Sequence, residues 1–96
     1  MLKITQTALS TITKEMLNDT NEETKPKIRL SMGIGWGGPQ LRLAQVESAL
    51  MNDEITEENG IQFLVNEKDK AYFNNVKIDY VKTPQEEEGQ FKVIML

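Results

Sequence analysis

The segment from Gly33 to Gly38 reads GIGWGG and formally fits the pattern G-x-G-x-x-G of dinucleotide-binding turns. Such a turn needs a strand before it and a helix after it, because the pyrophosphate must meet the N-terminus of the helix. Here Pro39 and an alternating, strand-like stretch follow instead, and the sequence contains no G-K-[ST] for a phosphate loop. We therefore interpret the segment as a glycine loop between two strands, and we expect no cofactor-binding residues.

Trp36 is the one residue of this loop that could make a large contact. A tryptophan among glycines either packs back over a sheet or is exposed for recognition, and the sequence leaves both open. In the second case Gly35, Trp36, Gly37 and Gly38 form a candidate contact loop.

Carboxylates gather in two places, at Asp53-Glu54 with Glu57-Glu58 and at Glu86-Glu87-Glu88. Oxygen ligands of this kind hold hard cations, but neither cluster has the D-x-[DN]-x-[DN]-G spacing of a calcium loop. We expect both to be solvated faces and predict no metal site.

Asp79 lies among strand-forming residues and is expected to be partly buried, paired with Lys77 or another lysine. No second carboxylate is spaced to lie beside it, so no acid–base pair can be argued. We predict no catalytic residues.

Composition narrows the chemistry further, because the 96 residues include no cysteine and no histidine. The chain therefore lacks a disulfide, a thiolate nucleophile, a thiolate metal site and the commonest neutral-pH acid–base group. Eleven basic residues against fifteen acidic ones give a net charge of −4, which argues against nucleic acid as a partner. We expect a protein that is not an enzyme.

The N-terminus has no apolar core of a signal peptide, and no run approaches the ~20 apolar residues of a membrane helix. We expect a cytoplasmic protein without membrane contact, formed by a single domain over residues 1–96.

Two helices are predicted between short strands. Thr5 or Thr7 is expected to cap a first, longer helix whose apolar face repeats at the helical period. Asn66 is expected to cap a short helix over Glu67–Phe73. The remaining apolar positions alternate as in strands, and these lie at 2–4, 28–32, 41–46, 55–58, 61–65, 76–81 and 91–94.

Asn59-Gly60 between two of these strands is a strong hairpin signal, because both residues tolerate positive φ. The segment Ser48–Asp53 could be either a bulged continuation of a strand or a loop. Together the pattern predicts an α+β fold: a small, mostly antiparallel or mixed β-sheet sandwich with one longer N-terminal helix and one short helix.

The stretch from Val65 to Val81 reads VNEKDKAYFNNVKIDYV and resembles the second half of the HesB/IscA-like domain, the A-type iron–sulfur assembly and carrier proteins. That domain has a strand, a short helix ending in aromatic or apolar residues, and a strand reading I/L-D-Y/F-V. Thr5, Ala8 and Ile28-Arg29-Leu30 before the glycine loop also fit the resemblance, which implies a HesB-like fold for nearly the whole chain.

The family's cluster ligands are missing. In the family the glycine loop reads G-C-S-G and a C-x-C tail follows the last strand. Here Trp36 takes the place of the loop cysteine, and the sequence given ends at Leu96 without cysteine. The resemblance therefore implies a divergent member that lacks the ligand cysteines, and no family ligand can be assigned to a residue here.

Two functions follow as expectations. The first is a cluster-independent, accessory role in iron–sulfur assembly, through binding to assembly proteins or through dimerising with a cysteine-bearing relative. The expected partners are thus assembly proteins, with a homo-oligomer as the alternative. The second is a small binding module that uses the Trp36 glycine loop as its contact surface.

Overall fold

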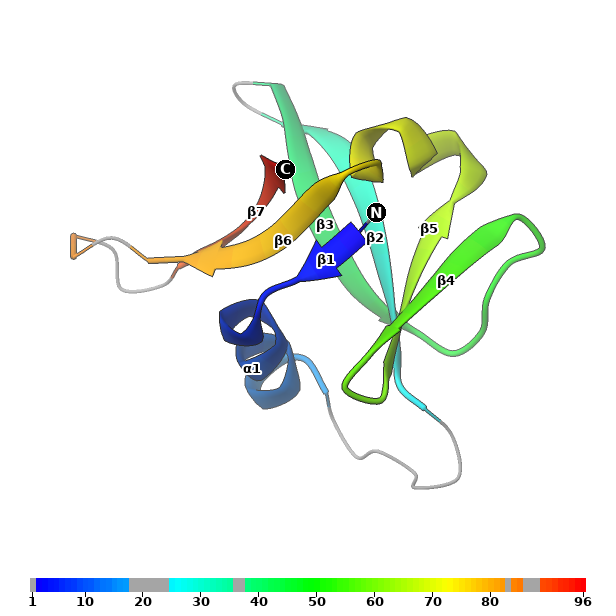
Figure 1. Ribbon diagram of the computed structural model, residues 1–96, viewed down its shortest axis with the longest axis horizontal. Helices are drawn as coiled ribbons and strands as arrows, with labels where there is room; N and C mark the ends of the chain where they lie inside the picture. The colour runs from blue at the N-terminus through cyan, green and yellow to red at the C-terminus, as the bar shows by residue number, and fades with distance from the viewer. Residues whose placement is uncertain (1, 18–24, 36–37, 83, 86–88) are drawn as a thin grey trace.

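The computed structural model describes residues 2–17, 25–35, 38–82, 84–85 and 89–96. In this part of the chain it contains seven strands and two helices, arranged in two mixed sheets (Figure 1). In chain order these elements are β1 (Leu2–Ile4), α1 (Gln6–Glu15), β2 (Lys27–Gly35), β3 (Gly38–Val46), β4 (Asp53–Glu58), β5 (Ile61–Asn66), the 3₁₀ helix η1 (Glu67–Phe73), β6 (Val76–Val81) and β7 (Gln90–Met95).

The two sheets have the strand orders β1-β6-β7 and β3-β2-β5-β4. Two of the five described pairings are parallel, β1 with β6 and β2 with β5, and the other three are antiparallel. The predicted α+β fold with a mixed, mostly antiparallel sheet arrangement and two helices of unequal length is confirmed.

The sequence left Thr5 and Thr7 open as the N-cap of helix α1, and the structure selects Thr5. The Thr5 hydroxyl oxygen accepts a hydrogen bond from the Ala8 amide at 3.1 Å, which satisfies one of the donors that every helix start leaves free. The helix buries Ala8, Leu9 and Ile12, and these residues lie on one face as the helical period requires.

The hairpin of β4 and β5 turns at Asn59 and Gly60, whose φ angles of 52° and 79° are both positive. This is the backbone that a two-residue hairpin turn of type I′ requires, and it confirms the prediction from the Asn-Gly pair. The short helix η1 also has its predicted bounds, and the Asn66 side chain accepts a hydrogen bond from the Lys68 amide at 3.3 Å.

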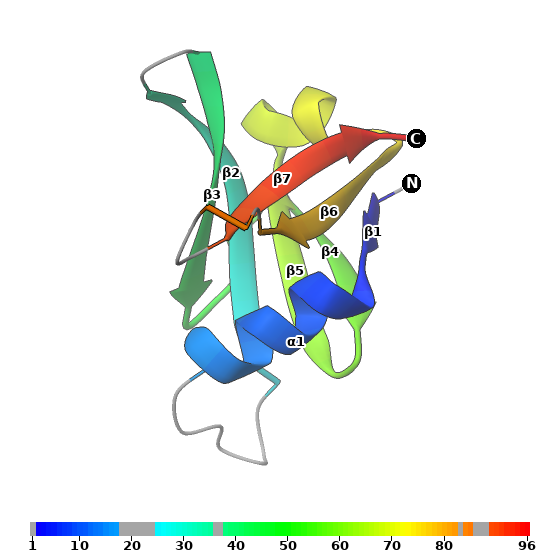
Figure 2. The ribbon, with the colours of Figure 1, turned by 90° about the vertical axis from the view of Figure 1, so that its left-hand side faces the viewer.

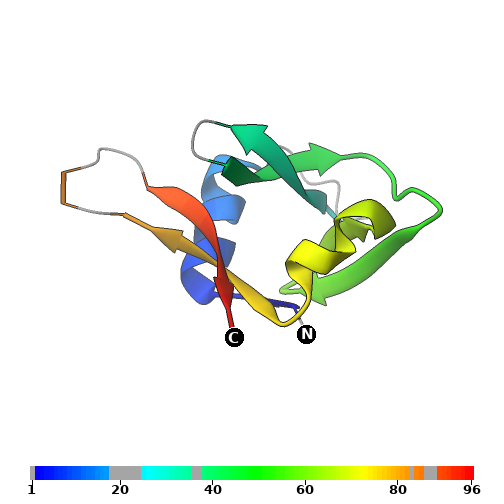
Figure 3. The ribbon, with the colours of Figure 1, turned by 90° about the horizontal axis from the view of Figure 1, so that it is seen from above.

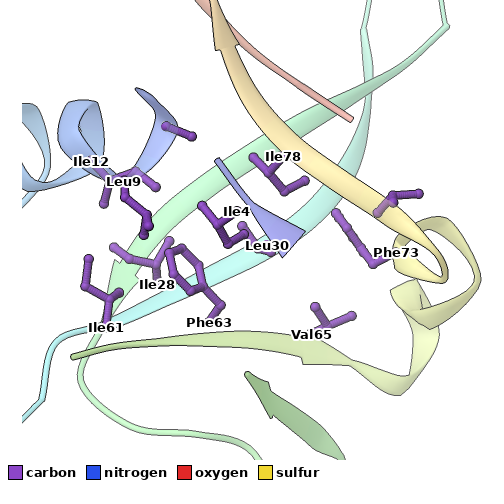
Figure 4. Packing of buried hydrophobic residues seen from close by; sticks show 12 residues of the cluster. Ile4, Leu9, Ile12, Ile28, Leu30, Ile61, Phe63, Val65, Phe73 and Ile78 are labelled. Carbon is purple, nitrogen blue, oxygen red and sulfur yellow. The ribbon is translucent and has the colours of Figure 1, made fainter. Parts of the chain in front are cut away.

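The hydrophobic core lies between the two sheets, with α1 and η1 closing its sides (Figures 3 and 4). Phe63 and its strand neighbours on β2 are fully buried there. The residues that form the core are Ile4, Ala8, Leu9, Ile12, Ile28, Leu30, Ile61, Phe63, Val65, Phe73, Val76 and Ile78. Every described element except β3, β4 and β7 contributes to this set, so these three strands lie at the margins of the core.

One prediction about the connections is corrected and one open alternative is settled. Gly33 and Ile34 belong to β2, whose ladder with β3 continues to the pair Gly35–Gly38, so the predicted loop over the whole glycine segment is wrong. Ser48–Asp53 is not a bulged extension of a strand, because β3 ends at Val46 and β4 begins at Asp53 on the opposite edge of the sheet.

Within the described residues, neither helix has the length and apolarity that crossing a membrane demands.

Candidate functional site

The glycine segment forms the far end of a long hairpin. Strands β2 and β3 pair over nine residues each, and the end of the hairpin extends past the neighbouring elements (Figure 2). Ile34 near this end is 91% exposed, although it is a large apolar residue. The hairpin therefore presents an apolar side chain away from the core.

The predicted contact loop is only partly described. Gly35 ends β2 and Gly38 begins β3, whereas Trp36 and Gly37 lie outside the described residues. Gly38 has a φ of +113°, a conformation that residues with a Cβ rarely adopt. The choice between a packed and an exposed Trp36 stays open.

Two further glycines of the G-x-G-x-x-G pattern have a packing role. The Arg42 side chain lies where a Cβ on Gly33 would be, and the Gln40 side chain occupies the corresponding place at Gly35. Because β3 side chains cross β2 at these points, the two glycines make room for them within a sheet. The pattern thus arises from strand packing, and no helix follows it as a dinucleotide site would require.

The first carboxylate cluster is divided among separate ion pairs. Asp53 forms a bidentate pair with Arg29, with both N–O distances at 2.8 Å. Glu57 pairs with Lys25, and Glu54 pairs with Lys70 at 2.9 Å. The second cluster, Glu86–Glu88, lies outside the described residues.

Asp53 is the most constrained of these carboxylates, and its side chain is fully buried. It also accepts hydrogen bonds from the Leu50 amide at 2.6 Å and from the Asn66 side chain at 3.1 Å. The hydrogen bonds from Arg29 hold the pKa of Asp53 well below its usual range, against the opposing effect of burial. The same contact raises the pKa of Arg29, so the pair is fully charged at neutral pH.

This network fixes the connection between β3 and β4. These strands are the two edges of the four-stranded sheet, so residues 47–52 must cross it. Arg29 projects from the face opposite the core, on the same side as Leu64, its register partner, which is fully buried. Asp53 therefore anchors the crossing segment to the outer face of the sheet. Each of its two carboxylate oxygens already accepts two hydrogen bonds, so neither is available to a cation.

Asp79 is part-buried as expected, but its partner differs from the prediction. Its carboxylate accepts hydrogen bonds from the Thr5 hydroxyl at 2.7 Å and from the Tyr80 amide at 2.9 Å. The expected lysine pairing is thus replaced by a bond to the residue that caps α1. The role is structural, since it joins the start of the helix to β6.

A groove of about 630 Å³ lies between β3 and β7. Its apolar lining comes from six residues spread over the sequence: Met16, Met32, Leu41, Leu43, Phe91 and Val93. This groove could not be predicted from the sequence, because its residues are neighbours only through the placement of the two sheets. The alternation of Leu41 with Leu43 and of Phe91 with Val93 was the only signal available.

The residue types of the chain do not fit an iron–sulfur cluster. Clusters are held by cysteine thiolates and in some cases by histidines, and the sequence contains neither residue type. Across the described residues, no three or more acidic side chains are placed to hold a metal ion together.

Several solved structures share this fold, although no family model and no curated protein sequence matches the chain. The crystal structure of IscA with a [2Fe-2S] cluster matches with a TM-score of 0.72 at 16% identity, over 97% of this chain and 80% of that one. SufA from Escherichia coli, which is involved in the biosynthesis of iron–sulfur clusters, matches with a TM-score of 0.68 at 19% identity, over 96% and 77%. A protein from Aquifex aeolicus, solved by NMR, gives 0.73 at 21% identity, over 96% and 88%. The chain therefore has the fold of IscA and SufA, which confirms the resemblance at the level of the fold.

Proposed function

We propose that this chain, which folds like IscA and SufA, acts in iron–sulfur cluster assembly as an accessory protein that binds a cluster-carrying partner and holds no cluster itself. The observation that carries the proposal is the combination of that fold, over nearly the whole chain, with a sequence free of cysteine. Clusters are held mainly by cysteine thiolates. A chain with this fold and no thiolate would therefore act by binding another protein through its surface.

The far end of the β2–β3 hairpin is the surface we assign to the partner. Ile34 is 91% exposed there, and Trp36 follows two residues later in the sequence. An exposed apolar side chain on a projecting element can be one of the few residues that dominate the energy of an interface, and tryptophan is enriched among such residues. In the proposed complex the partner contacts this hairpin directly, and no cluster ligand comes from this chain.

The test is an association experiment with an IscA-type or SufA-type protein that carries a [2Fe-2S] cluster. Under anaerobic conditions, native mass spectrometry is expected to detect a complex in which the cluster mass is counted once, on the partner. Ile34→Ser and Trp36→Ala are each expected to weaken the complex by about fivefold or more, the loss for a contact worth over 1 kcal/mol.

Ile55→Ser is the matched control, because Ile55 is also an exposed isoleucine but lies on β4, in the other hairpin. This variant should bind as the wild type does. The absence of any complex with either partner, or an equal loss in Ile34→Ser and Ile55→Ser, would contradict the proposal.

The second candidate is a small binding module that uses the Trp36 glycine loop independently of iron–sulfur assembly. The exposure of Ile34 at the end of the hairpin favours it as well. A pull-down that recovers a partner outside cluster assembly, and loses it with Trp36→Ala, would select this candidate. Sedimentation of the isolated chain determines whether it forms a homo-oligomer, which would be a third kind of assembly.

A further inference from the structure

The groove between β3 and β7 is bordered by two strand edges. In the described part of the chain, β3 is the outer strand of one sheet and β7 the outer strand of the other. They approach each other without pairing across the groove, and Figure 2 shows β7 crossing beside the β2–β3 hairpin. Such an edge offers backbone groups that another strand can pair with.

The register shows which β7 groups face the groove. The Leu96 amide donates to the Asn75 carbonyl at 3.0 Å, so residues 96, 94, 92 and 90 direct their backbone groups toward β6. Antiparallel strands alternate this direction at each residue. The N–H and C=O groups of Phe91, Val93 and Met95 therefore point away from β6, toward the free edge.

The outward backbone groups of β3 can be identified in the same way. The Gln62 amide donates to the Pro26 carbonyl at 2.9 Å, so even-numbered residues of β2 direct their backbone groups toward β5. Odd-numbered residues then face β3, and the β3 residues with outward backbone groups are 39, 41, 43 and 45. Pro39 has no N–H to offer at this edge, which blocks pairing near the end of the hairpin. The edge of β7 contains no proline.

The free edge of β7 is held in place before any partner arrives. The Phe91 ring packs against Tyr80 at a centroid distance of 4.9 Å. The Tyr80 hydroxyl in turn accepts a hydrogen bond from the Gly89 amide at 2.8 Å. A rigid edge lowers the entropy lost when a strand is added to it.

The groove has an apolar lining that suits alternating side chains. Phe91 and Val93 come from β7, Leu41 and Leu43 come from β3, and both pairs also pack against the core. Met16 and Met32 complete the lining, and methionine adapts its shape to different apolar groups. An extended segment next to β7 would direct every second side chain against this lining.

The charge of Lys92 indicates which kind of strand could bind beside β7. Lys92 is the one charged residue in the groove lining, and no ion pair joins it to any other residue that the structure describes. A lysine on an edge strand disfavours pairing with a second copy of itself. It favours a strand with a carboxylate on the same face.

We propose that the free edge of β7 binds an extended segment of another protein, in which apolar residues alternate with acidic ones, by adding it as a strand to the β1-β6-β7 sheet. Its backbone pairs with Phe91 and Val93, its apolar side chains fill the groove, and one carboxylate lies near Lys92. This inference does not depend on a role in iron–sulfur assembly, and the site is separate from the end of the hairpin.

The test uses a synthetic peptide of about eight residues in which valine alternates with glutamate, long enough to form one strand. At about 1 mM peptide, a concentration that detects weak binding, NMR is expected to show shifts at residues 90–95 and 41–43. Hydrogen exchange of the Phe91 and Val93 amides should slow, while Lys92 and Ile94, which already face β6, should change little.

Two comparisons separate strand addition from general stickiness. Methylation of the peptide amides on the valines alone, or on the glutamates alone, should abolish binding in only one of the two cases, because alternate amides face β7. Lys92→Glu should weaken binding about two- to fivefold, the range for an exposed charge pair. Lys82→Glu, an exposed site outside the groove with the same change in net charge, should not.

Five results would overturn the proposal. Three of them are shifts that map elsewhere or not at all, equal losses in both methylated peptides, and equal losses in the two glutamate variants. The fourth is a dimer of the chain itself that perturbs residues 90–95 and excludes the peptide. Binding of decanoate in the groove in preference to the peptide would also contradict it, because a fatty acid needs no strand edge.

Discussion

Single residues of this protein combine several structural tasks, and Asp53 is the clearest case. Its buried carboxylate joins Arg29 on β2, the Leu50 amide in the crossing segment and Asn66 at the end of β5. The sequence marked Asp53 as part of an acidic cluster, but not as the residue that anchors a connection. Its partners lie 24, 3 and 13 positions away, and only the folded sheet brings them together.

The low pKa of Asp53 predicts a loss of stability in acid. In the folded state the pKa of this carboxyl is lowered from its usual value, which is about 3.9 in the unfolded chain. Its contribution to stability is therefore complete at a pH well above that value and is lost as the pH falls below it. Urea unfolding of the wild type between pH 7 and pH 2 should show this decline. Asp53→Asn should cost about 1–3 kcal/mol at pH 7 and flatten the decline. A slope unchanged in the variant would contradict the assignment.

Alanine substitution is expected to affect stability differently at two of the glycines. Gly60→Ala should lower the free energy of unfolding by about 1–2 kcal/mol, because a φ of 79° is strained for alanine. Gly33→Ala should change it by less than about 0.5 kcal/mol, since only the flexible Arg42 side chain must move. Thermal unfolding of both variants checks this. A larger loss at Gly33 than at Gly60 would show that the glycine segment is constrained in another way.

At the scale of elements, local sequence signals were sufficient wherever a helix or turn depends on its own residues. The Asn59-Gly60 hairpin, the Thr5 cap and the bounds of η1 and β6 follow from such signals. The strand structure of the glycine segment could not be predicted in this way. Gly33 and Gly35 suggest a loop, and only the folded structure shows that the Arg42 and Gln40 side chains lie over them. The path of residues 47–52 likewise depends on which strands form the two edges.

The bond between Thr5 and Asp79 predicts coupling between α1 and β6. Thr5→Ala removes both the N-cap and this bond, and should cost about 1–2 kcal/mol. Thr5→Ser keeps the hydroxyl and should cost much less. A double-mutant cycle with Asp79→Asn should return a coupling energy of about 0.5 kcal/mol or more. Strict additivity would mean that the two residues act independently.

At the scale of the whole molecule, the fold could be predicted but its surfaces could not. A strand, short helix and strand between Val65 and Val81 led to the IscA-like fold, which the solved structures confirm. The groove between β3 and β7 depends on how two sheets lie against each other, and no local pattern encodes that. Of the candidate contact loop, Gly35 and Gly38 are strand residues that close the hairpin ladder.

Because clusters are held by cysteine thiolates and this sequence contains no cysteine, we expect the chain to bind no iron–sulfur cluster. Anaerobic reconstitution with ferrous iron and sulfide, followed by desalting and UV–visible spectroscopy, tests it most directly. We predict no protein-bound cluster absorbance and no retained iron or sulfide, because the sequence contains no cysteine or histidine to bind them. A cluster retained in stoichiometric amount by the cysteine-free chain would contradict it.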